Sequence, residues 1–284
     1  MSSNCAAMRA AVVGHVEWIE FAAVPAMPAA GDIVHAGEVW EEPGGGGAVA
    51  AVQLAKLAGA ARLYTALGDD ELGHRAKREL EAHGLRVEAV FRPEPQRRAF
   101  VHVDAAGERT ITVIGERLGP RADDALPWHE LNDADAVYLT AGDPGAVHLA
   151  RAARVLVSTV RGIEVLADAA VELDALVSSG ADRGERYEAG RLDPPPRAVV
   201  RTAGAAGGSW ETASGNGAYE AVPLPGPVRD AYGCGDSFAA GLTYGLGASL
   251  ALPAALELAA RCGAACLTGR GPYEGQLRGA EPAA

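Results

Sequence analysis

The sequence predicts an α/β fold in three layers, in which a mostly parallel central sheet is flanked by helices and carries a small β-sheet lid. Three observations support this prediction. Short apolar runs from residue 136 onward alternate with helical segments, which is typical of a parallel sheet covered on both faces. Two more polar strand regions, near 15–42 and 97–114, do not suit a sheet buried on both faces. The 284 residues, 49 % of them hydrophobic, suffice for a large core.

The N-terminal part contains alternating strand and helix patterns. Apolar residues recur either at every second position or at helical spacing, and Gly59 and Gly84 are suited to end helices. These patterns predict, in order, a strand over 10–21, a strand over 32–42, a loop over 43–47, a helix over 48–57, a strand over 63–67 and a helix over 69–83.

The remaining elements complete a sheet and its lid. Two alternating strands over 97–104 and 109–114, joined by 105–108, form a hairpin signal. Further elements are predicted as strands over 136–140, 155–158, 175–178 and 198–202, and as helices over 237–246 and 253–267. No linker divides the chain, so we expect one domain over 8–280, with lid strands from about 15–42 and 97–115.

Composition excludes several classes of protein. The formal net charge is −12, and no Lys/Arg block interleaved with aromatic residues occurs, so a nucleic-acid surface is not expected. No apolar stretch approaches the length of a membrane span. The first seven residues lack the charged start and apolar block of a secretory leader, so a cytoplasmic protein is expected. The seven histidines do not cluster, and none is expected to be catalytic.

The segment from Arg229 to Gly241 carries the clearest chemical signal. Gly233 and Gly235 lie just ahead of Asp236, and a helix-forming run follows at once. Glycines at a helix start allow backbone N–H groups to converge on an anion, and the helix dipole favours negative charge there. A carboxylate at the same point can accept a proton from an attacking hydroxyl. This pattern therefore suggests phosphoryl transfer to an alcohol.

The stretch from Asp230 to Asp236 resembles the second signature of the ribokinase-like (PfkB) carbohydrate kinases, which typically reads Asp-Thr-Thr-Gly-Ala-Gly-Asp. The resemblance implies the three-layer ribokinase-like fold, with Asp236 as the catalytic base. It implies that Gly233, Cys234 and Gly235 supply the anion hole. It also implies that Asp230 contributes to substrate binding and that Asp230, with Tyr232, shapes the loop and, in some members, a monovalent-cation site.

Residues 44–51 are similar to the first signature of the family, Gly-Gly-x-Gly-x-Asn-x-Ala, which implies that Gly45 and Gly46 approach the substrate. The Asn of the family, which bonds a sugar hydroxyl, is Val49 here. The usual substrate-binding Asp of the first strand falls on Ile19, and a register slip would let Glu17 or Glu20 serve instead. Both departures put the usual sugar preference in doubt.

Two weaker matches concern ATP and magnesium. The turn after the strand at 198–202 resembles the Thr-x-Gly-x-x-Gly turn of the family beside the nucleotide, which implies that Thr202, Gly204 and Gly207 bind ATP. The Asn-x-x-Glu motif that organises Mg²⁺ in the family corresponds to 179–182, with Glu185 nearby. Asp182 is therefore the candidate metal residue, acting through water.

The sequence thus predicts an ATP-dependent kinase that phosphorylates a hydroxyl of a small sugar or sugar-like polyol. Two alternatives remain open. A nucleoside kinase of the same fold is one, because Trp18 could stack on a ring. A nucleotide- or metabolite-binding regulator without turnover is the other, because Val49 and Ile19 depart from the pattern of the family. A homodimer through the lid is a further expectation.

Overall fold

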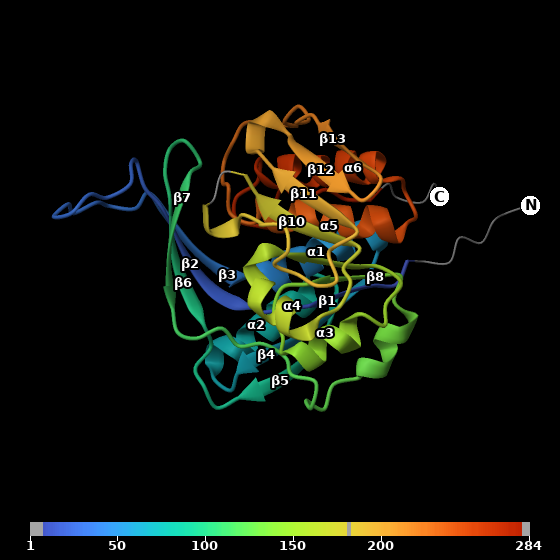
Figure 1. The fold of residues 1–284 in the computed structure, drawn as a ribbon. Coiled ribbons are helices and arrows are strands. Elements are labelled where there is room, and N and C mark those ends of the chain that lie inside the picture. Colours follow the sequence, from blue (N-terminus) through green and yellow to red (C-terminus); the bar gives the residue numbers. More distant parts are fainter. Residues whose placement is uncertain (1–7, 181–182, 280–284) are drawn as a thin grey trace, which may run out of the picture.

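The structure, a computed structural model, describes residues 8–180 and 183–279 (Figure 1). Within these residues the central sheet has nine strands in the order β13-β12-β11-β10-β9-β8-β1-β4-β5, and all pairs from β11 to β5 are parallel. The strands are β1 Ala10–Val13, β4 Ala61–Gly68, β5 Leu85–Arg92, β8 Ala136–Leu139, β9 Leu156–Thr159, β10 Ala175–Ser179, β11 Ala198–Thr202, β12 Gly208–Thr212 and β13 Gly215–Tyr219.

Helices cover both faces of this sheet, which makes the predicted three layers (Figure 1). One face packs against α1 Gly46–Ala58, α2 Glu71–Ala82, α5 Cys234–Gly247 and α6 Leu252–Cys266. The other face packs against the 3₁₀ helix η1 Trp128–Asp133 and against α3 Pro144–Ala150 and α4 Ile163–Ala169. Short 3₁₀ turns complete the described chain, namely η2 Val160–Gly162, η3 Arg183–Glu185 and η4 Gly204–Ala206.

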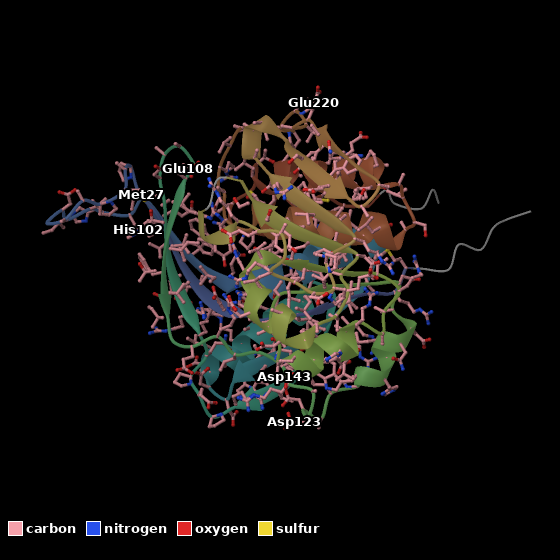
Figure 2. The ribbon with its side chains drawn as sticks, in the orientation of Figure 1. Met27, His102, Glu108, Asp123, Asp143 and Glu220 are labelled. Carbon is pink, nitrogen blue, oxygen red and sulfur yellow. The ribbon has the colours of Figure 1, made fainter. Side chains whose placement is uncertain are left out.

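The lid is a second sheet of the described chain, with the strand order β3-β2-β6-β7. Its strands are β2 Glu17–Ala23, β3 Glu38–Gly44, β6 Arg98–Val103 and β7 Arg109–Ile114. It stands at one side of the body, and the segment 24–37 between β2 and β3 projects away from it (Figure 1). Figure 2 marks the lid by His102 and Glu108 and this connecting segment by Met27.

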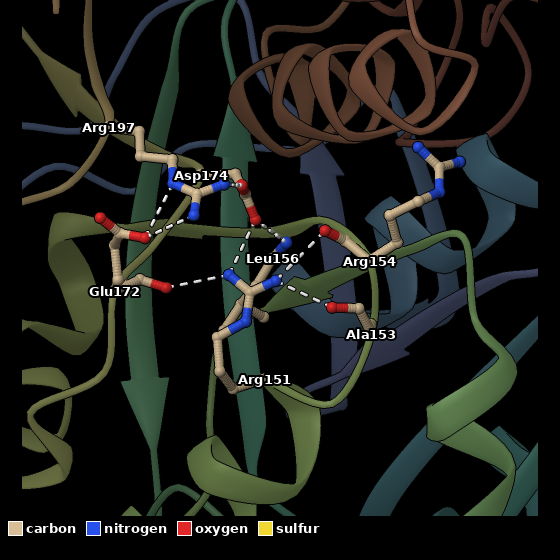
Figure 3. A network of polar contacts seen from close by, with 7 residues as sticks. All are labelled: Arg151, Ala153, Arg154, Leu156, Glu172, Asp174 and Arg197. Atoms are coloured by element: carbon tan, nitrogen blue, oxygen red, sulfur yellow. Dashed lines mark hydrogen bonds and ion pairs between the residues drawn. The ribbon is translucent and has the colours of Figure 1, made fainter.

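A network around Asp174 connects the amino ends of the neighbouring strands β9, β10 and β11 (Figure 3). Its carboxylate lies 2.8 Å from Arg151 and 2.9 Å from Arg197, and it accepts a hydrogen bond of 2.8 Å from the backbone N–H of Leu156. These residues stand at the starts of β9, β10 and β11 or just before them. The network therefore stabilises the amino ends of these strands. It lies far from their carboxyl ends.

The order of the strands reverses at β1, because the chain proceeds from β1 to β4 and β5 on one side and to β8 through β11 on the other. In open α/β sheets, ligands bind outside the carboxyl ends of the strands at such a switch point. His15 follows β1 and Thr140 follows β8, and the His15 Nδ1 and Thr140 Oγ1 atoms are 3.4 Å apart. The sheet thus marks the place of a ligand site.

Three features of the observed strands differ from the sequence-based expectation. The segment 10–21 is two strands in two different sheets, because the chain leaves the body at Gly14 and enters the lid at Glu17. A Cβ atom on Gly14 would lie 2.4 Å from Thr140 Oγ1, so the chain crosses there at very close range. The strand predicted over 32–42 begins only at Glu38, and β5, β12 and β13 were not predicted.

Candidate active site

A cavity of about 300 Å³ opens at the carboxyl ends of β1, β9, β10 and β11, beside the lid. It brings together residues from distant parts of the chain that the sequence had singled out. The residues of that set in its lining are Glu17, Gly45, Gly46, Thr202, Gly233, Gly235 and Asp236. The convergence places the expected base, anion hole and substrate loop at one location.

The N-terminal residues of two helices, α1 and α5, line this cavity, and the Gly45 N–H donates to the Tyr232 hydroxyl at 3.0 Å. Gly45 precedes α1 with φ +84°, and Gly233 precedes α5 with φ +80°, a left-handed conformation that glycine adopts without strain. A Cβ atom on Gly235 would meet no atom within 4 Å, so the glycine leaves open space beside the helix start. Both helix dipoles favour negative charge here, which suits phosphate groups.

Asp236 lies in the first turn of α5 and faces the start of α1. A Cβ atom on Gly46 would be only 2.8 Å from Asp236 Oδ1, so the absence of a side chain at Gly46 allows the carboxylate its position. Burial raises the pKa of the Asp236 carboxyl, and the Arg161 guanidinium opposes that rise. The ionised carboxylate can accept a proton from a hydroxyl bound in the cavity.

The lid contributes Glu17, whose carboxylate Oε1 lies 2.6 Å from Arg97 Nε. Burial raises the pKa of the Glu17 carboxyl, and the positive charge of Arg97 opposes the rise. By contrast Glu20, the other carboxylate considered, pairs with Arg98 at 3.6 Å and does not line the cavity. Of the two, Glu17 is the one placed to accept hydrogen bonds from substrate hydroxyls.

His15 also lines the cavity, which the sequence did not indicate. Its ring lies 3.8 Å from Glu17, but burial, together with the positive charges of Arg117, Arg97 and Arg161, holds its pKa well below the usual value. The ring is therefore neutral at pH 7. A neutral imidazole offers one donor and one acceptor to a bound polar molecule.

Four arginines line the cavity, namely Arg97, Arg109, Arg117 and Arg161. Arg161 Nε lies 2.5 Å from Glu185 Oε1, so this pair links η2 to η3 at the wall of the cavity. None of the four was recognised from the sequence. A signal existed only for Arg161, which follows the predicted strand over 155–158, since ligands bind outside the carboxyl ends of parallel strands.

Several predicted site residues lie outside the lining of the cavity. Cys234 turns its sulfur toward Asp230 O, 3.9 Å away, so only its backbone can face an anion. Asp230 is fully buried, and its carboxylate accepts hydrogen bonds from the backbone N–H groups of Tyr232 at 2.8 Å and Gly271 at 3.0 Å. Asp230 was predicted to bind substrate, but it does not line the cavity, because its carboxylate is engaged by the backbone of its own loop and of Gly271.

The nucleotide turn is formed as a 3₁₀ turn at the end of β11. Thr202 lines the cavity, whereas Gly204 and Gly207 continue the turn beyond its lining with φ +56° and +76°. Gly207 is required there, because a Cβ atom would lie 2.1 Å from Tyr219 O. This turn and the start of α5 lie at the same edge of the sheet.

The two departures from the family pattern are both core positions. Val49 is fully buried in α1, and a Cβ atom on Gly233 would lie 2.9 Å from its Cγ1. Ile19 is fully buried in the lid, beside Gly44. Trp18 is also buried, and the Arg75 guanidinium lies 4.3 Å from its ring centre. The Trp18 ring is thus occupied and unable to stack on a substrate.

No group of three or more His, Cys, Asp or Glu side chains able to hold a metal occurs among residues 8–180 and 183–279. Asp182, the candidate metal residue, lies outside the described residues. Magnesium that accompanies ATP would therefore be coordinated largely by phosphate oxygens and water. In the same described part, no helix has the length and apolar character needed to cross a membrane.

Comparison with known proteins agrees with this geometry. The model of the pfkB family carbohydrate kinases matches residues 8–158 and 150–277. The ATP-dependent ribose-1-phosphate kinase of Halopiger xanaduensis is 29 % identical over 276 residues, which cover 90 % of this chain and 91 % of that protein.

Solved structures show the same fold at lower identity. Ribokinase from Arabidopsis thaliana, complexed with ribose and ATP, superposes with a TM-score of 0.73 at 19 % identity, over 95 % of this chain and 96 % of that one. Ribokinase from Cryptococcus neoformans in complex with ADP gives a TM-score of 0.72 at 21 % identity, over 94 % and 96 % of the two chains.

Proposed function

Because this chain belongs to the pfkB family of carbohydrate kinases and is a phosphotransferase with an alcohol acceptor, we propose that it transfers the γ-phosphoryl group of ATP to a hydroxyl of a small sugar, with Asp236 as general base. One observation carries the proposal. The Asp236 carboxylate and the N-termini of α1 and α5 face one cavity, so a base and an anion hole surround the same space.

The chemistry follows from the positions of these groups. The acceptor hydroxyl oxygen forms a bond to the γ-phosphorus, while the bond from that phosphorus to the bridging oxygen of ADP breaks. Asp236 takes the hydroxyl proton as the attack begins. The backbone N–H groups around Gly233, Cys234 and Gly235 stabilise the negative charge on the phosphoryl oxygens in the transition state.

The remaining assignments belong to the same proposal. Glu17 accepts hydrogen bonds from acceptor hydroxyls, and Gly45 and Gly46 allow the acceptor close to the backbone. Thr202, Gly204 and Gly207 form the nucleotide turn. The lid covers the acceptor and limits the access of water, which restricts ATP hydrolysis. Residues 8–280 act as one catalytic unit, and the cytoplasm supplies the ATP.

Two further elements are proposed at the edges of the site. A monovalent cation beside Asp230 would balance a carboxylate that is fully buried and has no ion-pair partner in the described part of the chain. A homodimer through the lid would cover apolar side chains such as Val39, which is 64 % exposed on β3. Activity assays with and without potassium test the cation site. Light scattering tests the homodimer.

Three types of acceptor fit a cavity of about 300 Å³. They are a free pentose or hexose, a nucleoside, and a pentose phosphate, the last suggested by the substrate in the name of the haloarchaeal relative. The occupied Trp18 ring removes the observation that favoured a nucleoside. A regulator without turnover has no use for a carboxylate at the position of Asp236.

An ATP-consumption screen tests the proposal. Purified protein with Mg²⁺ is assayed across pentoses, hexoses, sugar phosphates and nucleosides, with Asp236→Asn as the blank. Turnover with one acceptor that is lost in the variant supports the kinase and its base. Equal ADP release by both proteins, dependent on an acceptor, would contradict the role of Asp236.

A further inference from the structure

The cavity is lined by more positively than negatively charged side chains. Four arginines face three carboxylates, Glu17, Glu185 and Asp236. Two of those carboxylates already pair with an arginine, Glu17 with Arg97 and Glu185 with Arg161. Arg109 and Arg117 have no ion-pair partner within the described ranges 8–180 and 183–279. Cations held together in this way call for an anionic ligand.

Of the two unpaired arginines, Arg109 belongs to the lid and Arg117 to the segment that leads from the lid to the body, whereas Arg161 belongs to the body. Arg109 begins β7, and Arg117 follows that strand by three residues. Arg161 lies in η2, directly after β9. Its pair with Glu185 uses Nε, and among residues 8–180 and 183–279 neither of its Nη groups has an ion-pair partner. An anion between Arg117 and Arg161 would therefore contact both that segment and the body.

The location of these arginines separates them from the nucleotide turn. Arg117, Arg97 and Arg161 act on the charge of His15, which follows β1. Thr202 ends β11, and β8, β9 and β10 lie between these two strands in the sheet. Four strand spacings amount to about 19 Å. A group bound at the β11 turn does not reach His15, whereas the start of α5 does, because a Cβ atom on Gly46 would lie 2.8 Å from Asp236 Oδ1 and 3.6 Å from His15 Cε1. The transferred phosphoryl group therefore lies at the Asp236 end of the arginine group, and Arg117, which also lines the second cavity, remains for a further anion.

A second cavity of about 340 Å³ adjoins the first and shares Arg117 and Arg161 with it. It lies between the segment 116–121 and the starts of α3 and α4. The two shared arginines therefore stand at the boundary between the cavities. A ligand group that binds both arginines would therefore lie at one end of the acceptor. The reacting hydroxyl, at the other end, would face Asp236.

We infer that the acceptor is a sugar phosphomonoester, and that its phosphate is bound between Arg117 and Arg161, with the Arg97 guanidinium as a further donor. This inference rests on the proposed kinase function and names the acceptor class for that site. Guanidinium groups bind phosphate through paired N–H donors, and His15 offers another hydrogen bond. The product is a sugar bisphosphate, because the ester phosphate of the acceptor is retained while a second one forms.

The test compares phosphorylated and unphosphorylated acceptors of the same sugar. The probes are a pentose, its 1-phosphate, its 5-phosphate and the corresponding sugar acid, assayed with saturating ATP. We expect kcat/KM to be at least about a hundredfold higher for one of the two phosphates than for the parent pentose, since two or more charge-assisted hydrogen bonds are at stake. A preference for the free pentose or for the sugar acid would overturn the inference.

Arg117→Gln identifies the residue, and Arg121→Gln is its matched control. Arg121 lies in the same segment but lines only the second cavity. We expect Arg117→Gln to lower kcat/KM for the preferred phosphate about 10- to 100-fold and to reduce the ratio of phosphate to parent sugar, with the KM for ATP unchanged. Arg121→Gln should keep the wild-type ratio. An unchanged ratio in Arg117→Gln would contradict the assigned role.

A binding measurement separates this inference from the kinase itself. The 1-phosphate and 5-phosphate are titrated by calorimetry into Asp236→Asn in the absence of ATP, with and without the Arg117→Gln change. Binding that depends on Arg117 supports the phosphate site even if no turnover is found. Absent binding of both phosphates, together with turnover of a free sugar by the wild type, would leave the kinase standing and reject the phosphate site.

Discussion

A methyl group on Gly46 would lie 2.8 Å from Oδ1 of Asp236, so the first residue of α1 and the first turn of α5 are fitted to each other. The two residues are 190 positions apart in the sequence, and each belongs to a different glycine-rich motif. Their proximity connects the loop that we propose to bind the acceptor with the proposed general base.

Gly46→Ala is expected to reduce turnover by displacing the Asp236 carboxylate. Its backbone needs no left-handed conformation, so the effect comes from contact and not from φ strain. We expect kcat to fall about 10- to 100-fold, as is typical of a small misplacement of a catalytic group. Steady-state kinetics measure this effect. Gly37→Ala, which meets no atom within 4 Å, is the control and should retain wild-type kcat.

Glu17→Gln is expected to weaken binding of the acceptor and not of ATP. The change removes a charged hydrogen-bond acceptor from the cavity and leaves Arg97 without its partner at 2.6 Å. The KM for the acceptor should rise about tenfold or more, with the KM for ATP unchanged. Glu20→Gln, on the same strand but outside the cavity, is the comparison. A larger effect from Glu20→Gln would assign the substrate contact to that residue.

Glu42 is expected to make stability dependent on pH. Burial raises the pKa of its carboxyl from 4.5 to about 7, a rise that Asp230 and Glu79 reinforce and that Trp40 and Arg270 oppose. Because the folded state holds the proton more tightly, this contribution to stability is fully present below about pH 4.5 and is lost as the pH rises through 7.

Glu42→Gln removes this titration. The variant should therefore gain in Tm relative to the wild type as the pH rises from 5 to 8, by about 2–4 °C for each kcal/mol involved. Thermal melts by circular dichroism at several pH values measure the difference. A constant offset between the two proteins over this range would show that Glu42 does not titrate there.

Asp174→Ala is expected to destabilise the fold without changing catalysis. The substitution leaves Arg151, Arg197 and the N–H group of Leu156 without their shared acceptor (Figure 3). We expect the free energy of unfolding to fall by about 2 kcal/mol. Urea unfolding measures the loss. At 25 °C, the kcat of the folded variant should equal that of the wild type, since the network lies at the amino ends of the strands.

Much of the fold follows from sequence periodicity, and the exceptions have physical causes. The runs at 136–140, 155–158, 175–178 and 198–202 are the parallel strands β8 to β11, because continuous burial on both faces leaves an apolar signature. The prediction of a single strand over 10–21 was wrong. Alternation of apolar residues gives no information on which sheet a residue joins, and Gly14 marks the change only through a contact with distant Thr140.

The lining of the cavity was predictable where one short segment combines glycines with a carboxylate. Glycines and a carboxylate at the start of α5 form such a segment, and the structure places Gly233, Gly235 and Asp236 in one cavity with Gly45 and Gly46. The sequence did not indicate Arg109, Arg117 and Arg161, because each is isolated in the sequence. They line one cavity only in the folded protein. His15 was missed for the same reason.

The rate of acceptor-dependent ADP formation by Asp236→Asn tests the central claim most directly. With a phosphorylated sugar acceptor and Mg²⁺, we expect a loss of at least about a hundredfold in kcat, as for removal of a general base, with a Tm and ATP affinity near those of the wild type. Asp174→Asn serves as a carboxylate control distant from the cavity. Turnover by Asp236→Asn close to that of the wild type would contradict the account.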